Sequence, residues 1–322
     1  MRIFARAALL IFMACFLHAA NAHAQSWPQR PVRLIVPAGT STAIDFAARL
    51  YAERLGEIWN KPVVIENRPG GDGITGVAAF AATSDDHTLL FAHSAPVAVQ
   101  PVIHEKLPYD PARDLVPISI ASDIFIVIAT TEALEARSIA DLVATTRKRP
   151  GKLNWAAGPG LPQYVFAAFL RSTGLDMTLV SYREVPPLLQ DFREGRLHVA
   201  AHSLAAVRSV VQSGKARLLA VANSQRSSIA PDVPTAVEAG FPALGMDGFC
   251  GFYGRRGISD ELRDKIARDV RTVASDPKIV ERLASTGQVA RASTPAEFST
   301  ALDALRQRIA RIAGTTAKGS GQ

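Results

Sequence analysis

Cysteine is nearly absent from this chain, which has two in 322 residues, Cys15 and Cys250. Cys15 lies in an N-terminal segment that we expect to be removed, so the mature protein would keep one thiol and no internal disulfide. We expect Cys250 to serve as a small buried hydrophobic side chain. The sequence also lacks a cluster of cysteine and histidine at metal-ligand spacing, so it predicts neither a metal site nor a cofactor.

A large surplus of either charge is also lacking. The chain has 36 Lys and Arg against 29 Asp and Glu, and removal of Arg2 and Arg6 with the N-terminal segment leaves 34 against 29, a net charge of +5. The basic residues are spread along the chain, whereas a nucleic-acid surface needs them clustered on one face. The composition therefore argues against a nucleic-acid partner and mildly favours anionic ligands.

The one prominent apolar run, at the N-terminus, has the form of an export signal. Arg2 and Arg6 precede the apolar residues 7–17, a run too short for a membrane-spanning helix, which needs about 20. Ala22 and Ala24 supply small residues ahead of a cleavage site, which predicts cleavage near Ala24 and export to the periplasm. The remaining residues would form a soluble protein large enough for two lobes.

Short β-rich runs alternate with amphipathic helical patterns through the rest of the chain. The predicted strands are 32–36, 62–65, 88–92, 118–129 and 153–156, and the predicted helices include 139–147, 260–274, 277–285 and 295–312. This alternation predicts an α/β fold in which helices cover both faces of the sheets. Because such sheets bind ligands beyond the carboxyl ends of their strands, we expect the site in the loops that follow them.

Two of these loops have the composition of anion-binding loops. The first consists of Ala38, Gly39, Thr40, Ser41 and Thr42, and the second contains Gly158, Pro159 and Gly160. Thr42 is the expected N-cap of a helix, with Asp45 at capping-box spacing. A helix N-terminus has free N–H groups and a partial positive charge, which suits a carboxylate. We expect the loops to face each other across a cleft, although each could simply be a well-capped helix start.

A run of glycines follows the predicted strand 62–65 and has the spacing of a nucleotide-binding motif. Gly71, Gly73 and Gly76 match the dinucleotide-binding pattern G-x-G-x-x-G after a strand. Residues 66–69 separate the strand from the glycines, whereas the fingerprint needs a tight turn, and no acidic residue follows at about 20 residues. We reject a nucleotide site. An exported enzyme such as an oxidoreductase stays as an alternative, but no Ser/His/acid arrangement supports it, and we expect no enzymatic activity.

Several further motifs occur in a fixed order along the mature chain. They are WP at 27–28, LIVP at 34–37, PVVIENRPG at 62–70, LPYDP at 107–111, DLVPI at 114–118, PGKL at 150–153, GK at 214–215 and PDVPT at 231–235. Through them the chain resembles the receptors of tripartite tricarboxylate transporters, also called the Bug family of extracytoplasmic solute receptors.

The resemblance implies a two-lobed periplasmic binding protein of type II, with a mostly parallel sheet flanked by helices in each lobe and a hinge of two crossing strands. One lobe would comprise residues 25–123 and 226–318 and the other 124–225, after a signal peptide at 1–24 and before a tail at 319–322. Ligand carboxylates would be held by loops 38–42 and 158–163, the latter including Gln163, with a third contact region at 182–187.

The resemblance also implies a small carboxylate ligand and membrane permease subunits as partners of a receptor expected to be a monomer. A sensor that signals to a membrane partner is an alternative use of the same fold. Ser41 and Thr42 replace glycines that family members usually have, Leu161 lies in a loop that is usually serine-rich, and Glu184 replaces a usual glycine. These departures lie in the predicted site.

Four side chains complete the predicted site. Arg183 could pair with a ligand carboxylate or form a salt bridge with a nearby acid such as Glu184. Ser94, His202 and Ser203 follow predicted strands at the cleft end, where they could contact a ligand or simply begin a helix. His93 and His202 without a carboxylate at ligand spacing are too little to predict a metal.

Overall fold

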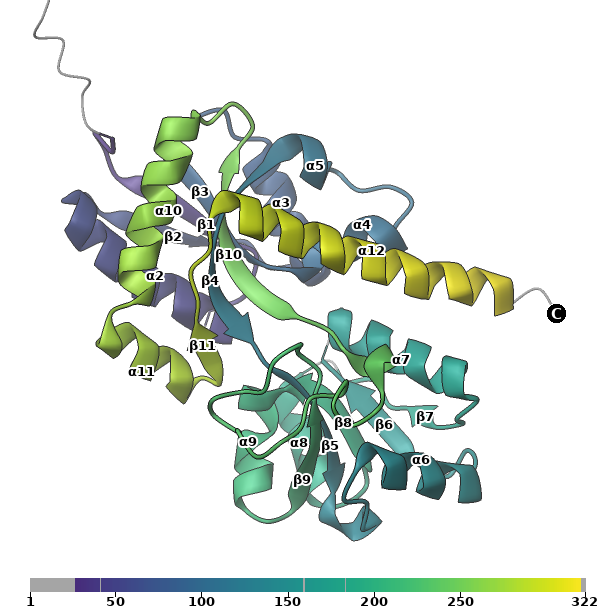
Figure 1. The fold of residues 1–322 in the computed structure, drawn as a ribbon. Helices are drawn as coiled ribbons and strands as arrows, with labels where there is room; N and C mark the ends of the chain where they lie inside the picture. The colour runs from purple at the N-terminus through teal and green to yellow at the C-terminus, as the bar shows by residue number, and fades with distance from the viewer. Residues whose placement is uncertain (1–26, 41, 159, 183, 320–322) are drawn as a thin grey trace, which may run out of the picture.

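The computed structural model describes residues 27–319 except 41, 159 and 183. Figure 1 shows two α/β lobes; the N- and C-terminal parts of the chain together form lobe 1, and the middle part forms lobe 2. The helix α12 extends from lobe 1 and lies beside α7 of lobe 2. Within the described residues, no helix combines the length and the apolar character that a membrane crossing requires.

Lobe 1 is built on a six-stranded sheet in the order β11-β4-β10-β3-β1-β2. Its strands are β1 (Val32–Val36), β2 (Val63–Asn67), β3 (Thr88–His93), β4 (Leu115–Ile124), β10 (Gly248–Arg255) and β11 (Gln288–Ala290). Its helices are α2 (Ala43–Trp59), α3 (Ile74–Ala81), α4 (Gln100–Ile103), α5 (Pro111–Asp114), α10 (Asp260–Ala274), α11 (Pro277–Ser285) and α12 (Pro295–Gly319), with one-turn helices η1 (Gly71–Gly73) and η2 (Ala95–Val99).

Lobe 2 is built on a five-stranded sheet in the order β7-β6-β8-β5-β9. Its strands are β5 (Ile126–Thr131), β6 (Asn154–Ala157), β7 (Thr178–Leu179), β8 (Val199–Ser203) and β9 (Ala216–Val221). Its helices are α6 (Ile139–Lys148), α7 (Leu161–Thr173), α8 (Val185–Arg193) and α9 (Leu204–Gln212), with short helical turns η3 (Glu132–Leu134) and η4 (Pro242–Leu244).

Both sheets combine parallel and antiparallel pairs. β1 is parallel to β2 and β3, and β6 is parallel to β7 and β8, as the alternation of strands and helices predicts. The strands that enter from the other lobe run in the opposite sense: β10 is antiparallel to β3 and β4, and β5 to β8 and β9. The two-lobed α/β fold class is confirmed, and the sheets are mixed because the chain crosses between the lobes.

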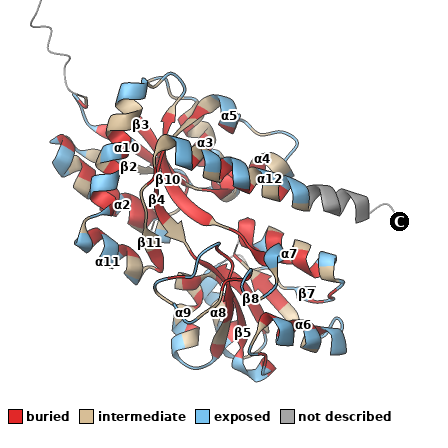
Figure 2. Cartoon of the chain, viewed as in Figure 1, coloured by how far each residue is buried: buried red, intermediate tan, exposed pale blue. Residues whose placement is uncertain are grey.

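Each sheet has a hydrophobic core on both faces, as Figure 2 indicates by the buried residues at the centre of each lobe. In β1, Leu34 packs on one face with Tyr51 of α2, while Ile35 packs on the other with Phe80 of α3. Because both faces of β1 are covered, its sequence is an almost unbroken apolar run. Cys250 of β10 is buried as a free thiol in one of these cores, which confirms its predicted role.

The lobes are joined where the apolar stretch 118–129 passes from one sheet to the other. β4 ends at Ile124 and β5 begins at Ile126. The buried side chain of Asn223 joins both sides of this crossing, because its Nδ2 donates to Ile124 O at 3.0 Å and its Oδ1 accepts from Ile126 N at 3.0 Å. The chain then packs Ala236 and Leu244 into a core of lobe 2 before it returns to lobe 1 as β10.

Candidate ligand-binding site

A cavity of about 340 Å³ lies between the two lobes, at the ends of strands β1, β3, β6 and β8. Seven residues of the predicted site line it: Ala38, Gly39, Thr42, Ser94, Gly158, His202 and Ser203. They come from both lobes and from loops more than a hundred residues apart in sequence. The structure therefore brings these loops together around one space, which we call the cleft cavity.

Three described residues of the predicted site, Thr40, Gly160 and Gln163, do not line the cleft cavity. Thr40 is exposed and is not among the residues that line the cleft cavity. Gln163 lines a neighbouring cavity of about 210 Å³ together with Tyr182 and Glu184, and His202 lies at the border of the two cavities. Gly160 lies next to Asp72 of lobe 1 across the cleft. Ser41, Pro159 and Arg183 fall outside the described residues.

The first loop is held in place by Asn67 at the end of β2. Its Nδ2 donates to Ala38 O at 3.1 Å and to Asp45 Oδ1 at 2.8 Å. Thr42 is the N-cap of α2, as predicted: its Oγ1 accepts from Asp45 N at 3.2 Å and donates to Gly39 O at 2.9 Å. The buried carboxylate of Asp45 also accepts from Arg49 Nε at 2.9 Å. One asparagine of the family motif thus fixes both the loop and the helix start.

Four helices begin at the cleft cavity. Their N-caps are Thr42 for α2, Gly73 for α3, Gly160 for α7 and Ser203 for α9, and each helix contributes its N-cap or first-turn residue to the lining. Two of these helices belong to lobe 1 and two to lobe 2. The N-terminal ends of helices have free N–H groups and a partial positive charge, so their convergence favours an anionic group in the cavity.

Two uncharged histidines, His93 and His202, line the cleft cavity and can donate hydrogen bonds. The pKa of His202 is lowered to about 4 by burial, and its Nδ1 accepts from Ser203 N at 2.8 Å. Burial also lowers the pKa of His93, against the opposing effect of Asp72, and its Nδ1 accepts from Ala95 N at 3.2 Å. Because each Nδ1 is an acceptor, the proton of each neutral ring lies on Nε2, which makes this atom the donor.

The glycine run after β2 contributes Asp72 to the cavity lining. A Cβ at Gly76 would lie 2.5 Å from Pro37 Cβ, so the glycine is needed where α3 packs on the first loop. Asp72 has a positive φ of 52°, and its Oδ2 accepts from Gln100 Nε2 at 2.8 Å. These glycines match a nucleotide fingerprint in the sequence, and Asp72 between them was not among the predicted site residues. An acid between glycines directly after a family motif was the available signal.

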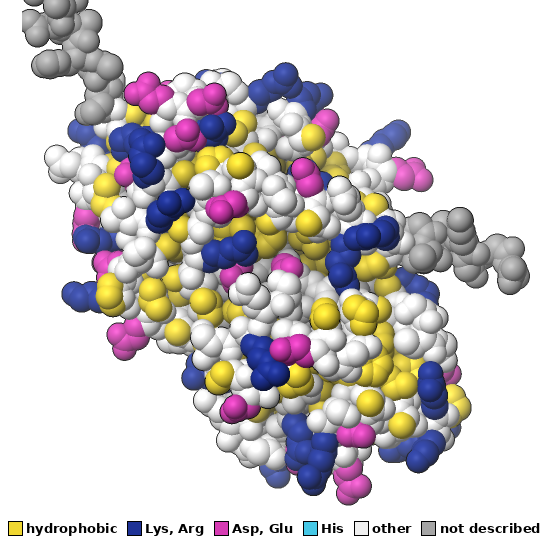
Figure 3. Space-filling model, viewed as in Figure 1, with side chains coloured by type: hydrophobic (Ala, Val, Ile, Leu, Met, Phe, Trp, Pro, Cys, Tyr) yellow, Lys and Arg dark blue, Asp and Glu magenta, His cyan; other side chains and the backbone are white. Residues whose placement is uncertain are grey.

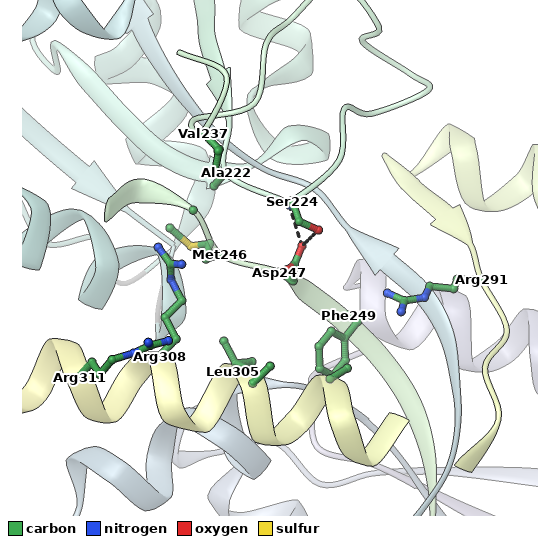
Figure 4. Close-up of a pocket in the computed structure, with 13 residues that line it drawn as sticks. Ala222, Ser224, Val237, Met246, Asp247, Phe249, Arg291, Leu305, Arg308 and Arg311 are labelled. Atoms are coloured by element: carbon green, nitrogen blue, oxygen red, sulfur yellow. Dashed lines mark hydrogen bonds between the residues drawn. The ribbon is translucent and has the colours of Figure 1, made fainter. Parts of the chain in front are cut away.

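A second cavity of about 330 Å³ lies between α12 and the segment that leads into β10 (Figure 4). Asp247 and Phe249 line it, while Gly248 between them lines the cleft cavity, because neighbouring residues of an extended strand face opposite sides. Arg308 of α12 donates to Pro242 O, and burial lowers its pKa. Asp247 accepts hydrogen bonds from Ser224 N at 2.8 Å and from Ser224 Oγ at 3.0 Å. No predicted site residue among those described lines this space.

The surface charges give no sign of a nucleic-acid interface on the face that Figure 3 presents. Basic and acidic side chains alternate over it, and no large area of one sign is visible. Many of the arginines are paired with acids, such as Arg30 with Asp85 and Arg226 with Glu238. This face therefore shows no large area of one charge that could serve as an alternative to the cleft cavity.

Comparison with known proteins agrees with this fold. The sequence pattern of the family described as the tripartite tricarboxylate transporter family receptor matches residues 47–302. The chain belongs to this family. The resemblance seen in the motifs is thereby confirmed, and the family and fold are those of solute-binding proteins.

Individual relatives cover almost the whole chain. Protein BugT of Bordetella pertussis is 30% identical over 289 residues, which cover 88% of this chain and 89% of BugT. A solved periplasmic transporter superposes with a TM-score of 0.79 at 26% identity and covers 90% of this chain and 98% of its own. A protein of R. palustris, solved with adipate, superposes with a TM-score of 0.77 at 27% identity and covers 90% of this chain and 99% of its own.

Proposed function

We propose that this protein is a periplasmic receptor that captures a small carboxylate-containing ligand in the cleft cavity and delivers it to the membrane subunits of a tripartite tricarboxylate-type transporter. The observation that carries the proposal is the convergence of four helix N-termini, two from each lobe, on one cavity. The adipate in the solved R. palustris relative supports the carboxylate as a ligand class.

The two-lobe arrangement couples binding to closure. A carboxylate that accepts hydrogen bonds from both lobes has more partners in the closed form than in the open form, so it shifts the population towards closure. Hydrogen bonds to a charged group contribute about 1.5–3 kcal/mol each. A few of them reach the roughly −8 kcal/mol of micromolar affinity once the costs of ordering are subtracted. The closed form would be the state that docks on the permease.

Export and lobe boundaries are part of the proposal. Residues 1–24 would direct the chain across the membrane and be removed. The predicted boundaries place residues 25–123 and 226–318 in one moving body and 124–225 in the other. Because Ala236 and Leu244 pack in a core of lobe 2, we propose instead that the chain rejoins lobe 1 at β10. The segment 1–24 lies outside the described residues. Mass spectrometry of the protein purified from the periplasmic fraction would show whether the mature N-terminus is Gln25; an intact N-terminus in the cytoplasmic fraction would contradict export.

The binding proposal is tested by isothermal titration of the mature protein with a panel of mono-, di- and tricarboxylates. We expect at least one micromolar ligand; a folded protein that binds none would contradict the proposal. Ser203→Ala removes an N-cap that lines the cavity, and we expect about tenfold weaker binding. Ser259→Ala is the matched control, because Ser259 caps α10 in the same way but is exposed and does not line the cavity.

A further inference from the structure

Asp72 gives the cleft cavity an unexpected charge for a carboxylate receptor. Of the described residues that line the cavity, it alone carries a formal charge, and that charge is negative. The other polar lining groups are hydroxyls, backbone groups and the two neutral histidines. A ligand with several carboxylates would therefore meet a fixed carboxylate inside its own site.

No described residue compensates the charge of Asp72: its titratable neighbour His93 stays neutral because burial lowers the pKa of the ring against the opposing effect of Asp72. Its Oδ2 accepts a hydrogen bond from the neutral amide of the buried Gln100 at 2.8 Å. Among the described residues, no lysine or arginine forms an ion pair with it. A carboxylate in a partly desolvated cavity without a cationic partner favours a ligand that brings one.

Asp72 also lies at the N-terminus of α7, a helix of the other lobe. Gly160, the N-cap of α7 in lobe 2, approaches it so closely that a Cβ at Gly160 would lie 2.4 Å from Asp72 Oδ2. Asp72 of lobe 1 thus places its own negative charge at the N-terminus of a helix in lobe 2. Pro162 in the first turn of α7 has no N–H to offer. This end of the cavity therefore disfavours a second ligand carboxylate.

Apolar side chains form much of the rest of the wall. Ile44, Ile124, Ile126 and Leu161 line the cavity from both lobes, and its volume of about 340 Å³ accommodates a small organic molecule. Such a wall favours a hydrocarbon body over a chain of hydroxyls, because burial of apolar surface is favourable only when the ligand is itself apolar.

From these observations we infer that the cleft cavity takes a small zwitterion, with one carboxylate, an apolar body and a protonated nitrogen that pairs with Asp72, in preference to a di- or tricarboxylate. The inference rests on the proposed function and names its ligand class. The carboxylate occupies the helix ends away from Asp72. One charged hydrogen bond gained or lost changes affinity by about 10- to 100-fold, so Asp72 is the residue that sets the preference.

Matched ligands test the inference by titration calorimetry. Hexanoate, adipate and 6-aminohexanoate share a six-carbon chain and differ in their far end, and butyrate, succinate and 4-aminobutyrate form the same series with four carbons. We expect the aminoalkanoate to bind the wild-type protein at least about tenfold more tightly than the dicarboxylate of the same length. In Asp72→Asn the aminoalkanoate should lose about tenfold and the dicarboxylate should gain.

Asp72→Asn should keep the fold. Asp72 has a positive φ of 52°, a conformation that asparagine adopts more readily than most residues. Asp232→Asn, at an exposed aspartate that does not line the cavity, is the control and should leave the order of the ligands unchanged. Thermal unfolding of both variants checks their folding. If Asp72→Asn does not fold, the order of the ligands on the wild-type protein decides alone.

The outcomes separate the two proposals. If a dicarboxylate binds most tightly to the wild-type protein, or if Asp72→Asn folds and leaves the order unchanged, the inference is overturned while the carboxylate receptor stands. If the folded wild-type protein binds none of these ligands nor any other carboxylate of the wider panel, the proposed function fails and the inference fails with it.

Discussion

The pH dependence of stability should report on the buried histidine His202. Burial lowers its pKa from 6.5 to about 4, and its Nδ1 already accepts the N–H of Ser203 at 2.8 Å. In the unfolded chain the ring takes up a proton near pH 6.5. Between pH 6.5 and 4 the unfolded state therefore binds a proton that the folded state does not, so the free energy of unfolding decreases as the pH falls. Above pH 6.5 the full contribution is present.

The size of this effect follows from the two pKa values. Each pKa unit between the folded and unfolded states corresponds to about 1.4 kcal/mol, so the step from 6.5 to about 4 amounts to about 3 kcal/mol as an upper value. At roughly 2–4 °C for each kcal/mol in a domain of 150–250 residues, the midpoint of thermal unfolding should shift by roughly 6–12 °C through this histidine alone.

Thermal unfolding at pH 7.5 and pH 4.5 measures the shift by comparison with variants. His202→Gln removes the titrating ring but keeps a donor, and His202→Asn removes it but keeps an acceptor for Ser203 N. Both should lose less stability on acidification than the wild-type protein. His104→Gln, at an exposed histidine, should behave as the wild type does. If the wild-type protein and both His202 variants lose the same stability, the argument from burial is refuted.

Three further predictions concern other positions. Asn67→Asp would place a second carboxylate against buried Asp45, so the free energy of unfolding at pH 7, measured by chemical denaturation, should fall by about 3 kcal/mol. This loss should become smaller towards pH 4. Gly160→Ala should weaken ligand binding more than tenfold, while Gly174→Ala, with a similar positive φ but no atom within 4 Å of its Cβ, should leave calorimetric titrations unchanged. Cys250 should not react with a thiol reagent until the protein unfolds, because burial raises the pKa of its thiol; fast labelling of the folded protein would contradict this.

Much of the fold could be predicted because its signals are local. The apolar run of β1 and the helices Asp260–Ala274 and Pro277–Ser285 have the bounds that periodicity and helix starts indicate. β10 was not predicted, since its glycines at 248, 251 and 254 interrupt the strand pattern. Those glycines are required by packing: a Cβ at Gly251 would lie 2.5 Å from the ring of Phe298, a contact that depends on the distant helix α12.

The residues that line the cleft cavity could be predicted only where position after a strand decides it. Thr42 and Ser203 follow strands and cap helices, so sequence alone places them at the cleft end. Asp72 was not predicted and His93 was considered only as a metal ligand, because their position in the cavity lining depends on how the two lobes meet and not on any local pattern. Gln163 faces a different cavity from the one expected, since its position on α7 turns it towards Tyr182. Loop composition indicates a site, but tertiary contacts decide which side chains face it.

The side chain of Asn223 has a mechanical consequence for a receptor that opens and closes. By bonding to the backbone on both sides of Phe125, it fastens the segment after β9 to the β4–β5 crossing at one point. A joint fastened at one point allows rotation about that point but resists sliding of one lobe along the other. In the proposed receptor, the angle between the lobes would then be the main quantity that a ligand changes, and the proposed membrane partner would distinguish the loaded receptor from the empty one by that angle.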